Sequence, residues 1–476
     1  MLTSLILVPM LGGVVAWLTG RWAPRIARVV ALAVATAQAG LTTFALVVAT
    51  RSASGGLTSG LTGGGWPLRL DGLAAPLIAL TALLGVVAVL ASWRVRKNPG
   101  AHFAMLLALQ GAVMAVFLAA DLVVFYVAWE AVLVPMFFLI GVWGHEKRRH
   151  AAMKFFVYTF AGSALMLVGL IIVIATTGTT SIAQAVKTGL DARTGSLVFW
   201  LLAIGFAVKI PVWPLHTWLP DAHVEAPTAG SIMLAGVLLK MGGYGFIRLA
   251  LPLAPVAARA AAPVMATLGI VAIVYGALMA LAQSDLKRLV AYSSVAHMGF
   301  VVLAISIGSK LALTAAMLVM VAHGLTSALL FLLVGLLQDR AHTRDINRFG
   351  GLLRVVPGWG TALTFGLLAS LGLPGLAGFP GELLSTLEGF RAYGWWMGVV
   401  AIGIVLAGAY NLRALRRVAQ GPLAEEWREM RDLDLREAVA IAPLAVGILA
   451  LGVWPALVSS AVAPVVELVA KMLGGG

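Results

Sequence analysis

Long apolar stretches, separated by short groups of proline, glycine and charged residues, follow one another along the whole chain. A helix that spans a membrane needs about 20 consecutive, mainly apolar residues, and by that measure the pattern predicts about 14 such helices. The predicted ranges are 2–20, 26–50, 72–93, 101–120, 122–143, 153–176, 195–219, 227–248, 263–283, 288–308, 311–337, 359–388, 393–415 and 437–459. An even number of spans places both termini on the same side of the membrane.

Two of these spans are interrupted. The seventh contains Pro211 and Pro214, and the twelfth contains Pro374 and Pro380. Each proline removes a backbone donor and bends a helix. Matching interruptions in two halves of a membrane protein indicate an internal repeat with ion sites at the breaks. Because the breaks lie five spans apart and five is odd, two consecutive repeat units must run with opposite topology.

These observations predict the fold class and the division of the chain. We expect an all-α polytopic membrane protein with two inverted five-helix repeats, each containing one broken helix. The expected parts are a three-helix segment at 1–100, a first repeat at 101–250 (helices 4–8), a second, inverted repeat at 251–420 (helices 9–13), and a C-terminal helix and tail at 421–476.

Composition supports a membrane protein and excludes several function classes. Of 476 residues 61% are hydrophobic and 11% are charged, and the mean hydropathy is +1.00, whereas soluble domains carry about 25% charged residues. The connections are too short for a soluble catalytic head, a nucleotide-binding domain or a receptor ectodomain. The sequence has no cysteine, so disulfides, a thiolate nucleophile and cysteine-ligated clusters are excluded. Redox chemistry must therefore take place on another chain.

The formal net charge of +14 reflects the connections between spans. Of the 33 Lys and Arg residues, 22 fall in the odd-numbered connections and 9 in the even-numbered ones and the C-terminal tail. The positive-inside rule then predicts that the odd connections are cytoplasmic and that both termini lie on the outer, periplasmic side. Because this bias explains the positive charge, we expect no nucleic-acid partner.

Ionisable side chains inside the predicted spans are the candidate functional residues. Each costs about 2.5–3.5 kcal/mol near the bilayer centre on insertion scales, and such residues often mark proton or ion pathways. Lys209 and Glu382 lie at the two breaks, and the others lie inside continuous spans: Glu130, Lys240 and His323. Since they supply titratable groups to both repeat units, we predict a horizontal proton relay. The alternatives are a packing role and, for Lys240, a side chain that reaches toward an interface.

Further candidates are weaker. His297 lies in a polar patch of the tenth span that could be structural. The connection 214–227 contains no Lys or Arg and could collect protons at the mouth of the pathway through His216, Asp221, His223 and Glu225. The spacing of these four residues fits no zinc pattern, and no metal site is expected.

Five segments carry a resemblance to a known family that covers nearly the whole chain: 125–144, 214–227, 238–245, 284–300 and 323–333. They resemble the antiporter-like M subunits (NADH dehydrogenase chain 4 family) of the proton-pumping NADH:quinone oxidoreductase, respiratory complex I. The resemblance implies spanning helices with inverted repeats and breaks in the seventh and twelfth. It also implies roles for the candidates: Glu130 and Lys209 as a tuning pair, Lys240 as the central relay, and His323 as the bridge toward Glu382.

The resemblance further implies that electron transfer from NADH to a quinone in other subunits drives proton translocation. FMN and iron–sulfur clusters would belong to those subunits, and this chain would hold no cofactor. The implied partners are sister antiporter-like subunits, other membrane subunits, a hydrophilic redox arm and the lipid bilayer, in a bacterial inner membrane. Three alternatives stay open: a subunit of a multisubunit sodium/proton antiporter, a subunit of an energy-converting membrane hydrogenase, and a structural membrane scaffold.

Overall fold

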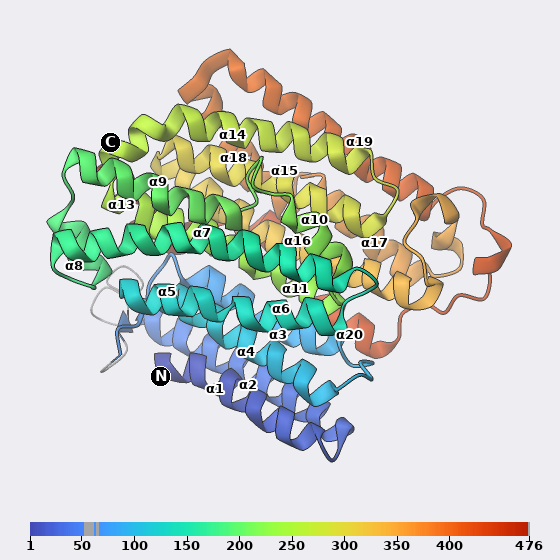
Figure 1. Ribbon diagram of the computed structural model, residues 1–476. Helices are drawn as coiled ribbons and strands as arrows, with labels where there is room; N and C mark the ends of the chain where they lie inside the picture. The colour runs from blue at the N-terminus through green and yellow to red at the C-terminus, as the bar shows by residue number, and fades with distance from the viewer. Residues whose placement is uncertain (52–60, 63–65, 475–476) are drawn as a thin grey trace.

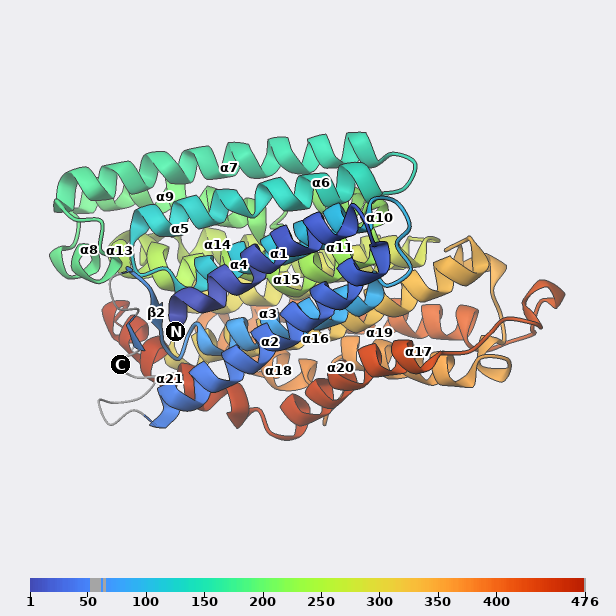
Figure 2. The ribbon, with the colours of Figure 1, turned by 90° about the horizontal axis from the view of Figure 1, so that it is seen from below.

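The computed structural model describes residues 1–51, 61–62 and 66–474 and consists almost entirely of helices packed side by side (Figures 1 and 2). The helices are α1 (Leu2–Gly20), α2 (Pro24–Arg51), α3 (Ala75–Ala91), α4 (Pro99–Leu118), α5 (Leu122–Ala131), α6 (Leu133–Trp143), α7 (Arg148–Thr177), α8 (Ile182–Thr188), α9 (Ala192–Lys209), α10 (Trp218–Glu225), α11 (Thr228–Met233), α12 (Leu239–Gly245), α13 (Leu251–Leu253), α14 (Pro255–Leu281), α15 (Leu286–Ile307), α16 (Lys310–Ala341), α17 (Pro357–Ser370), α18 (Gly378–Tyr393), α19 (Gly398–Val418), α20 (Leu435–Val453) and α21 (Ala456–Met472).

Short elements complete the chain. Two π-helical segments, η1 (Leu234–Leu238) and η2 (Phe246–Ala250), join α11, α12 and α13 into one continuous span. The remaining elements are single 3₁₀ turns and a two-stranded antiparallel ribbon: η3 (Ile346–Arg348), η4 (Leu352–Arg354), η5 (Gly394–Met397), η6 (Glu425–Trp427), β1 (Leu61–Thr62) and β2 (Arg69–Leu70).

Within the described residues, 12 helical stretches are long and apolar enough to cross a membrane. The chain is therefore an all-helical, multi-pass membrane protein. Helix α3, with 17 residues, is apolar but shorter than these stretches. Helix α16 lies near the middle of the assembly in both views (Figures 1 and 2), and its spanning window is 100% buried. A helix that is apolar all round belongs in such a core.

Helix interruptions occur at both places where the prolines predict them. Helix α9 ends at Lys209, and α10 begins at Trp218. Helix α17 ends at Ser370, and α18 begins at Gly378. Carbonyl groups at the ends of α9 and α17 are thereby freed from the helical hydrogen-bond ladder inside the protein.

Two aspartates begin corresponding helices in the two halves of the chain. Asp121 accepts hydrogen bonds from the backbone of Val123 at 2.8 Å and caps α5. Asp285 does the same for Lys287 at 2.8 Å and caps α15. Each aspartate also forms an isolated antiparallel bridge with a residue shortly after a later long helix. Asp121 pairs with Ser181, after α7, and Asp285 pairs with Asp345, after α16.

These two capped bridges lie at opposite ends of the helices. The α5–α6 stretch leads from Asp121 to the connection that contains His145. His145 shares a pocket with Asp285. The two matching pieces of backbone are therefore separated by the length of a span.

The C-terminal region differs from its prediction. The expected span 437–459 ends at Val453, and the expected tail is instead the 17-residue helix α21. One side of α21 is buried through apolar residues three or four positions apart: Val458, Val462, Val466 and Val469. Its other side carries Glu467, which pairs with Lys310 at 2.6 Å where α16 begins. The sequence pattern concealed this helix because Pro455 precedes it and charged groups shorten its apolar run.

Candidate functional site

Glu130 and Lys209 interact electrostatically, but they form no direct ion pair in the described structure. The Lys209 side chain, at the last residue of α9, is 1% exposed. Its Nζ lies 5.5 Å from the ring centre of Trp129 and 5.6 Å from that of Phe155, distances at which aromatic faces attract cations. The carboxylate of Glu130, on α5, is close enough to interact electrostatically with the ammonium group of Lys209. Neither Lys209 Nζ nor Glu130 Oε1 has a hydrogen-bond partner among the described residues.

Lys240 lies fully inside the protein and points to the second half of the chain. Its side chain is 0% exposed. The ammonium group contacts the carbonyl oxygen of Ala235 and lies 2.6 Å from Nδ1 of His323 on α16. Ala235 belongs to the π-helical segment η1, and such segments are frequent at functional sites. The alternative that Lys240 reaches toward an interface is therefore wrong.

Close packing brings α12 against the end of α9. A Cβ atom added to Gly242 would lie 2.7 Å from the Phe206 carbonyl oxygen and 2.6 Å from Cγ1 of Ile210. Only glycine permits this approach, which sets the helix of Lys240 beside the break that follows Lys209. No hydrogen bond joins the two lysines in the part of the chain that the structure describes.

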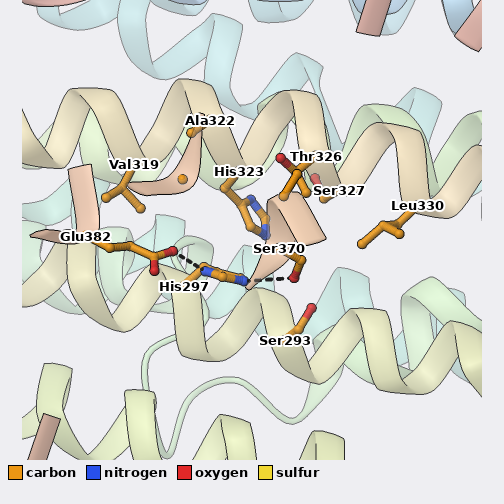
Figure 3. Close-up of a pocket in the computed structure, with 12 residues that line it drawn as sticks. Ser293, His297, Val319, Ala322, His323, Thr326, Ser327, Leu330, Ser370 and Glu382 are labelled. Carbon is orange, nitrogen blue, oxygen red and sulfur yellow. Dashed lines mark hydrogen bonds and ion pairs between the residues drawn. The ribbon is translucent and has the colours of Figure 1, made fainter. Parts of the chain in front are cut away.

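His323, His297 and Glu382 continue the line from Lys240. The rings of His323 and His297 are 5.6 Å apart. Nδ1 of His297 lies 2.8 Å from Oε1 of Glu382, and Nε2 lies 3.3 Å from Oγ of Ser370 (Figure 3). Together with the contact of Lys240, these distances define a nearly continuous chain of titratable groups from α12 through α16 and α15 to α18.

A small cavity accompanies this chain. It has a volume of about 20 Å³ and is lined by His297, His323, Ser327 and Glu382 among others (Figure 3). A volume of that order holds about one water molecule. Nε2 of His323 and the hydroxyl groups of Thr326 and Ser327 have no partner in the described structure. These unsatisfied polar atoms are the groups that a water molecule between the two histidines would bond.

The predicted cluster in the connection 214–227 does not form one site. Asp221 is paired with Lys154 at 2.6 Å and with Arg288 at 3.1 Å. His216 packs its ring edge-on against Tyr275 at 5.0 Å. The connection has no basic residue of its own, but α7 and α15 supply these two cations. Asp221 is therefore neutralised by two cations that lie outside the connection.

His223 and Glu225 are more deeply buried than Asp221. His223 is 0% exposed and stacks on Phe331 with ring centres 4.4 Å apart. Both of its ring nitrogens lack a partner among the described residues. Glu225 accepts a hydrogen bond from the backbone of Lys147 at 2.8 Å. No group of three or more His, Cys, Asp or Glu side chains converges within the described ranges.

Lys287 is a buried charge that the sequence pattern missed. It was counted among the charges of a connection, but its side chain is 0% exposed and its Nζ donates to the carbonyl oxygen of Ala226 at 2.6 Å. The charges of Lys287 and of Lys240 both act on His223. His223 is therefore near enough to both lysines to be affected by their charges. The Asp285 cap at the start of α15 was the only sequence signal for this placement.

An open pocket of about 400 Å³ lies at that end. It is lined by His145, Glu225, Asp285 and Arg344 among others. Burial, and then the positive charges of Lys287 and Arg344, lower the pKa of His145 to about 4. His145 is consequently neutral at pH 7, and the polar pocket gives water access to Glu225 beside the buried Lys287.

Comparison with protein families gives one match over residues 119–407, to the family described as NADH:quinone oxidoreductase/Mrp antiporter, TM. Among curated proteins, NADH-quinone oxidoreductase subunit M of Rhodobacter capsulatus is 43% identical, over 84% of this chain and 81% of its own length. The subunit of the same name from Escherichia coli K12 is 39% identical, over 96% of this chain and 94% of its own.

Two solved structures share the fold. A chain of respiratory complex I from Thermus thermophilus with bound NADH superimposes with a TM-score of 0.92 at 29% identity, and the match covers 100% of both chains. A chain of the membrane-bound sulfane sulfur reductase, an archaeal respiratory membrane complex, matches with a TM-score of 0.86 at 27% identity, over 96% of this chain and 77% of that chain.

Proposed function

This chain belongs to the family of antiporter-like M subunits of NADH:quinone oxidoreductase, respiratory complex I, and we propose that it conducts protons along the line of buried groups described above. Its contribution to the enzyme is proton translocation in the membrane. The observation that carries the proposed pathway is the nearly continuous line of titratable groups formed by Lys240, His323, His297 and Glu382. Such groups are costly in a membrane interior and are typical of proton relays.

The proposed relay has two stages. In the first, the distance between Glu130 and Lys209 controls the charge of the lysine, because a nearby carboxylate stabilises an ammonium group and its withdrawal favours release of the proton. In the second, the proton passes from Lys240 through His323 and His297 to Glu382. Groups coupled this closely titrate as a set rather than singly. Water between Lys209 and Lys240 would link the stages.

Protons would reach the line from the pocket near Asp285. Glu225 lines that pocket, and Lys287 lies behind it with its Nζ on the Ala226 carbonyl. The charges of Lys287 and Lys240 both act on His223, and its two ring nitrogens have no partner among the described residues. We assign Lys287 and His223 to proton uptake, while Asp221 and His216 contribute to the packing of α10.

The finer architecture is part of the proposal. We assign about 14 spanning helices and two inverted five-helix repeats, at 101–250 and 251–420. The matched caps and bridges of Asp121 and Asp285, which lie at opposite ends of the spans, support the inversion. In each unit a broken helix then carries one charged candidate. Lys209 is the last residue of α9, directly before the first break, and Glu382 lies in α18, after the second break.

Orientation and partners follow from charge and family. The excess of Lys and Arg in odd-numbered connections supports a cytoplasmic location for the end with the Asp285 pocket and an outer location for both termini. The bacterial sources of the curated relatives support a bacterial inner membrane. Sister antiporter-like subunits and a hydrophilic redox arm are the proposed partners.

FMN, iron–sulfur clusters, NADH and quinone are assigned to those other subunits. This chain has no cysteine, and in the described ranges no cluster of ligating side chains could hold a metal. The residues present therefore do not fit an iron–sulfur cluster, and no step of the relay is assigned to a redox group.

The experiment that tests this function measures NADH-driven proton uptake into inverted membrane vesicles that contain the assembled complex. We expect Glu130→Gln and Lys209→Ala to reduce uptake by at least about tenfold, because a positioned proton-transfer group contributes about 10²–10⁴-fold to a rate. The matched controls are Lys310→Ala and Glu467→Gln, which break an exposed lysine–glutamate pair and should leave uptake unchanged. Full uptake in an assembled Lys209→Ala complex would support the scaffold alternative. Co-purification without flavin and iron–sulfur subunits would support a sodium/proton antiporter.

A further inference from the structure

A strongly basic cleft lies at the end of the spans where α3 ends, away from the proton pathway. Its volume is about 550 Å³. Its walls come from α2, from the turn after α3 and from the start of α20. The lining consists of four arginines, one tryptophan and one aspartate: Arg28, Arg94, Arg96, Arg436, Trp93 and Asp434.

Ion pairs within the protein use only part of this positive charge. Arg94 lies 2.9 Å from the carboxylate of Asp434, and Arg436 lies 3.5 Å from the same carboxylate. Glu437, which is buried below them, pairs with Arg340 at 2.5 Å and also lies 3.8 Å from Arg94 and 3.6 Å from Arg436. Asp434 and Glu437 therefore balance Arg94 and Arg436, and in the described structure neither carboxylate pairs with the other two arginines of the cleft.

The other two arginines have unused donors. Arg28 donates to the carbonyl oxygen of Val95 at 3.1 Å, but its Nε is buried without a partner. Arg96 is exposed, and its side chain makes no hydrogen bond or ion pair with the residues that the structure describes. Both are available to a bound anion, and guanidinium groups are well suited to phosphate because they donate in pairs.

An apolar groove leads away from the cleft along α3. Helix α3 packs against both α2 and α20 and is mostly buried, but one stripe of it is partly exposed: Ala79, Leu83, Val86, Leu90 and then Trp93. These positions are three or four residues apart and therefore share one side of the helix. Exposed apolar side chains border the stripe near the cleft, Val29 (59%) on α2 and Val439 (52%) on α20.

The groove ends in a second hollow. At the other end of α3, a space of about 630 Å³ lies between α2, α3 and α21 and is lined mainly by apolar residues such as Leu46, Ala79 and Leu457. Figure 2 shows α2 and α20 on this side of the molecule. The surface is thus positive at one point and apolar along the rest of its length.

From this arrangement we infer that the cleft binds the phosphate headgroup of an anionic phospholipid, whose acyl chains lie along the exposed stripe of α3. A molecule with one anionic end and a long apolar body matches both the position of the charge and the composition of the groove. Basic pockets between spanning helices bind such headgroups, and tryptophan is enriched at the headgroup level of membranes. An acidic protein segment would instead need positive charge along its length.

The test compares lipid binding to the assembled complex after extraction in a mild detergent and removal of bulk lipid. Phosphatidylglycerol and phosphatidylcholine are added in turn, and bound lipid is counted by native mass spectrometry. The double variant Arg28→Gln/Arg96→Gln leaves both pairs with Asp434 intact. The matched control, Arg149→Gln/Arg417→Gln, removes two exposed arginines that do not line the cleft.

We expect the native complex and the control to prefer phosphatidylglycerol by about tenfold or more. In the double variant, affinity for that lipid should fall by about 30-fold, as expected for two lost arginine–phosphate contacts. Equal binding of both lipids, or equal affinity in the native complex and the double variant, would overturn the inference.

Competition in the native complex separates a lipid from a free anion and needs no variant. Soluble glycerol 3-phosphate should not displace phosphatidylglycerol at equal concentration, because it lacks the acyl chains that fill the groove. Displacement at equal concentration would assign the cleft to soluble phosphates instead. Protection of Arg96 from chemical modification by a neighbouring subunit, with lipid removed, would assign it to a protein partner.

Discussion

The imidazole of His297 lies 2.8 Å from the carboxylate of Glu382, so that a side chain on α15 is hydrogen-bonded to the second broken helix, α18. The other ring nitrogen of His297 faces Ser370 at the end of α17. One residue therefore contacts both sides of the break. The ring also lies 5.6 Å from His323, which makes His297 the connection between the centre of the protein and Glu382.

This relationship predicts a defect in His297 variants. His297→Leu should lower NADH-driven proton uptake by about tenfold or more, because it removes a proton-transfer group from the line. His297→Gln should lower uptake as well, although it retains hydrogen bonding and should preserve assembly. His102→Gln is the matched control, since His102 is another buried histidine but bonds Ser92 outside the line. Native uptake in both His297 variants would exclude the proposed role.

Proton uptake at the Asp285 pocket predicts a second defect. In Lys287→Met and in His223→Phe, delivery to Lys240 should become slower, because each change removes a titratable group between the pocket and the centre. We expect the initial rate of uptake to fall several-fold, by about 3- to 10-fold. The rate is measured by stopped-flow fluorescence of a pH dye in vesicles. Arg149→Gln, at an exposed position, is the control. A native rate in the His223 variant would exclude it from the path.

Replacing Asp71 should lower the stability of the complex rather than impair proton transport. Its carboxylate is 1% exposed, lies 2.6 Å from Arg248 and accepts hydrogen bonds from the backbone where α3 begins. Asp71→Asn leaves the Arg248 charge without a counter-charge, and such a loss costs about 3–5 kcal/mol. We expect a lower melting temperature of the complex. Asp191→Asn, at an exposed helix cap, should change it little, because asparagine caps a helix about as well as aspartate.

Asp71 also predicts how the stability of the complex changes with pH. Burial alone would raise the pKa of Asp71, but the charge and hydrogen bonds of Arg248, with Arg69 and the Ala74 backbone, hold it below its ordinary value. A carboxyl group whose pKa is lowered by folding contributes stability at neutral pH, and the contribution is lost as the pH falls toward that lowered pKa. The difference in melting temperature between native protein and Asp71→Asn should therefore shrink on acidification. A difference that grows would contradict this assignment.

Local signals made the breaks and most of the buried charges predictable. Three prolines act on their own segments and lie in the two helix interruptions, Pro211 and Pro214 in the first and Pro374 in the second, while Pro380 lies in the first turn of α18. Lys209 and Lys240 could be identified from the sequence because a charged residue within a long apolar segment is expected to lie inside the membrane, away from water. These predictions needed no knowledge of which helices are neighbours.

Contacts between distant segments could not be predicted in this way. His297 and Glu382 are 85 positions apart, and only the packing of α15 against α18 brings them together. The cations that neutralise Asp221 come from α7 and α15, so the isolated connection appeared free of positive charge. Lys287 looked like a residue of a connection because composition alone does not show that the first turn of α15, which follows the Asp285 cap, is buried.

The proton-to-electron ratio of the assembled complex with Lys240→Leu tests the relay most directly, because Lys240 joins the two halves of the line. The ratio is measured as protons moved per NADH oxidised, with Lys97→Leu, an exposed lysine, as the control. We predict that Lys240→Leu moves fewer protons per NADH, or oxidises NADH at least about tenfold more slowly because the steps are coupled. An unchanged ratio at an unchanged rate would contradict proton transfer through Lys240.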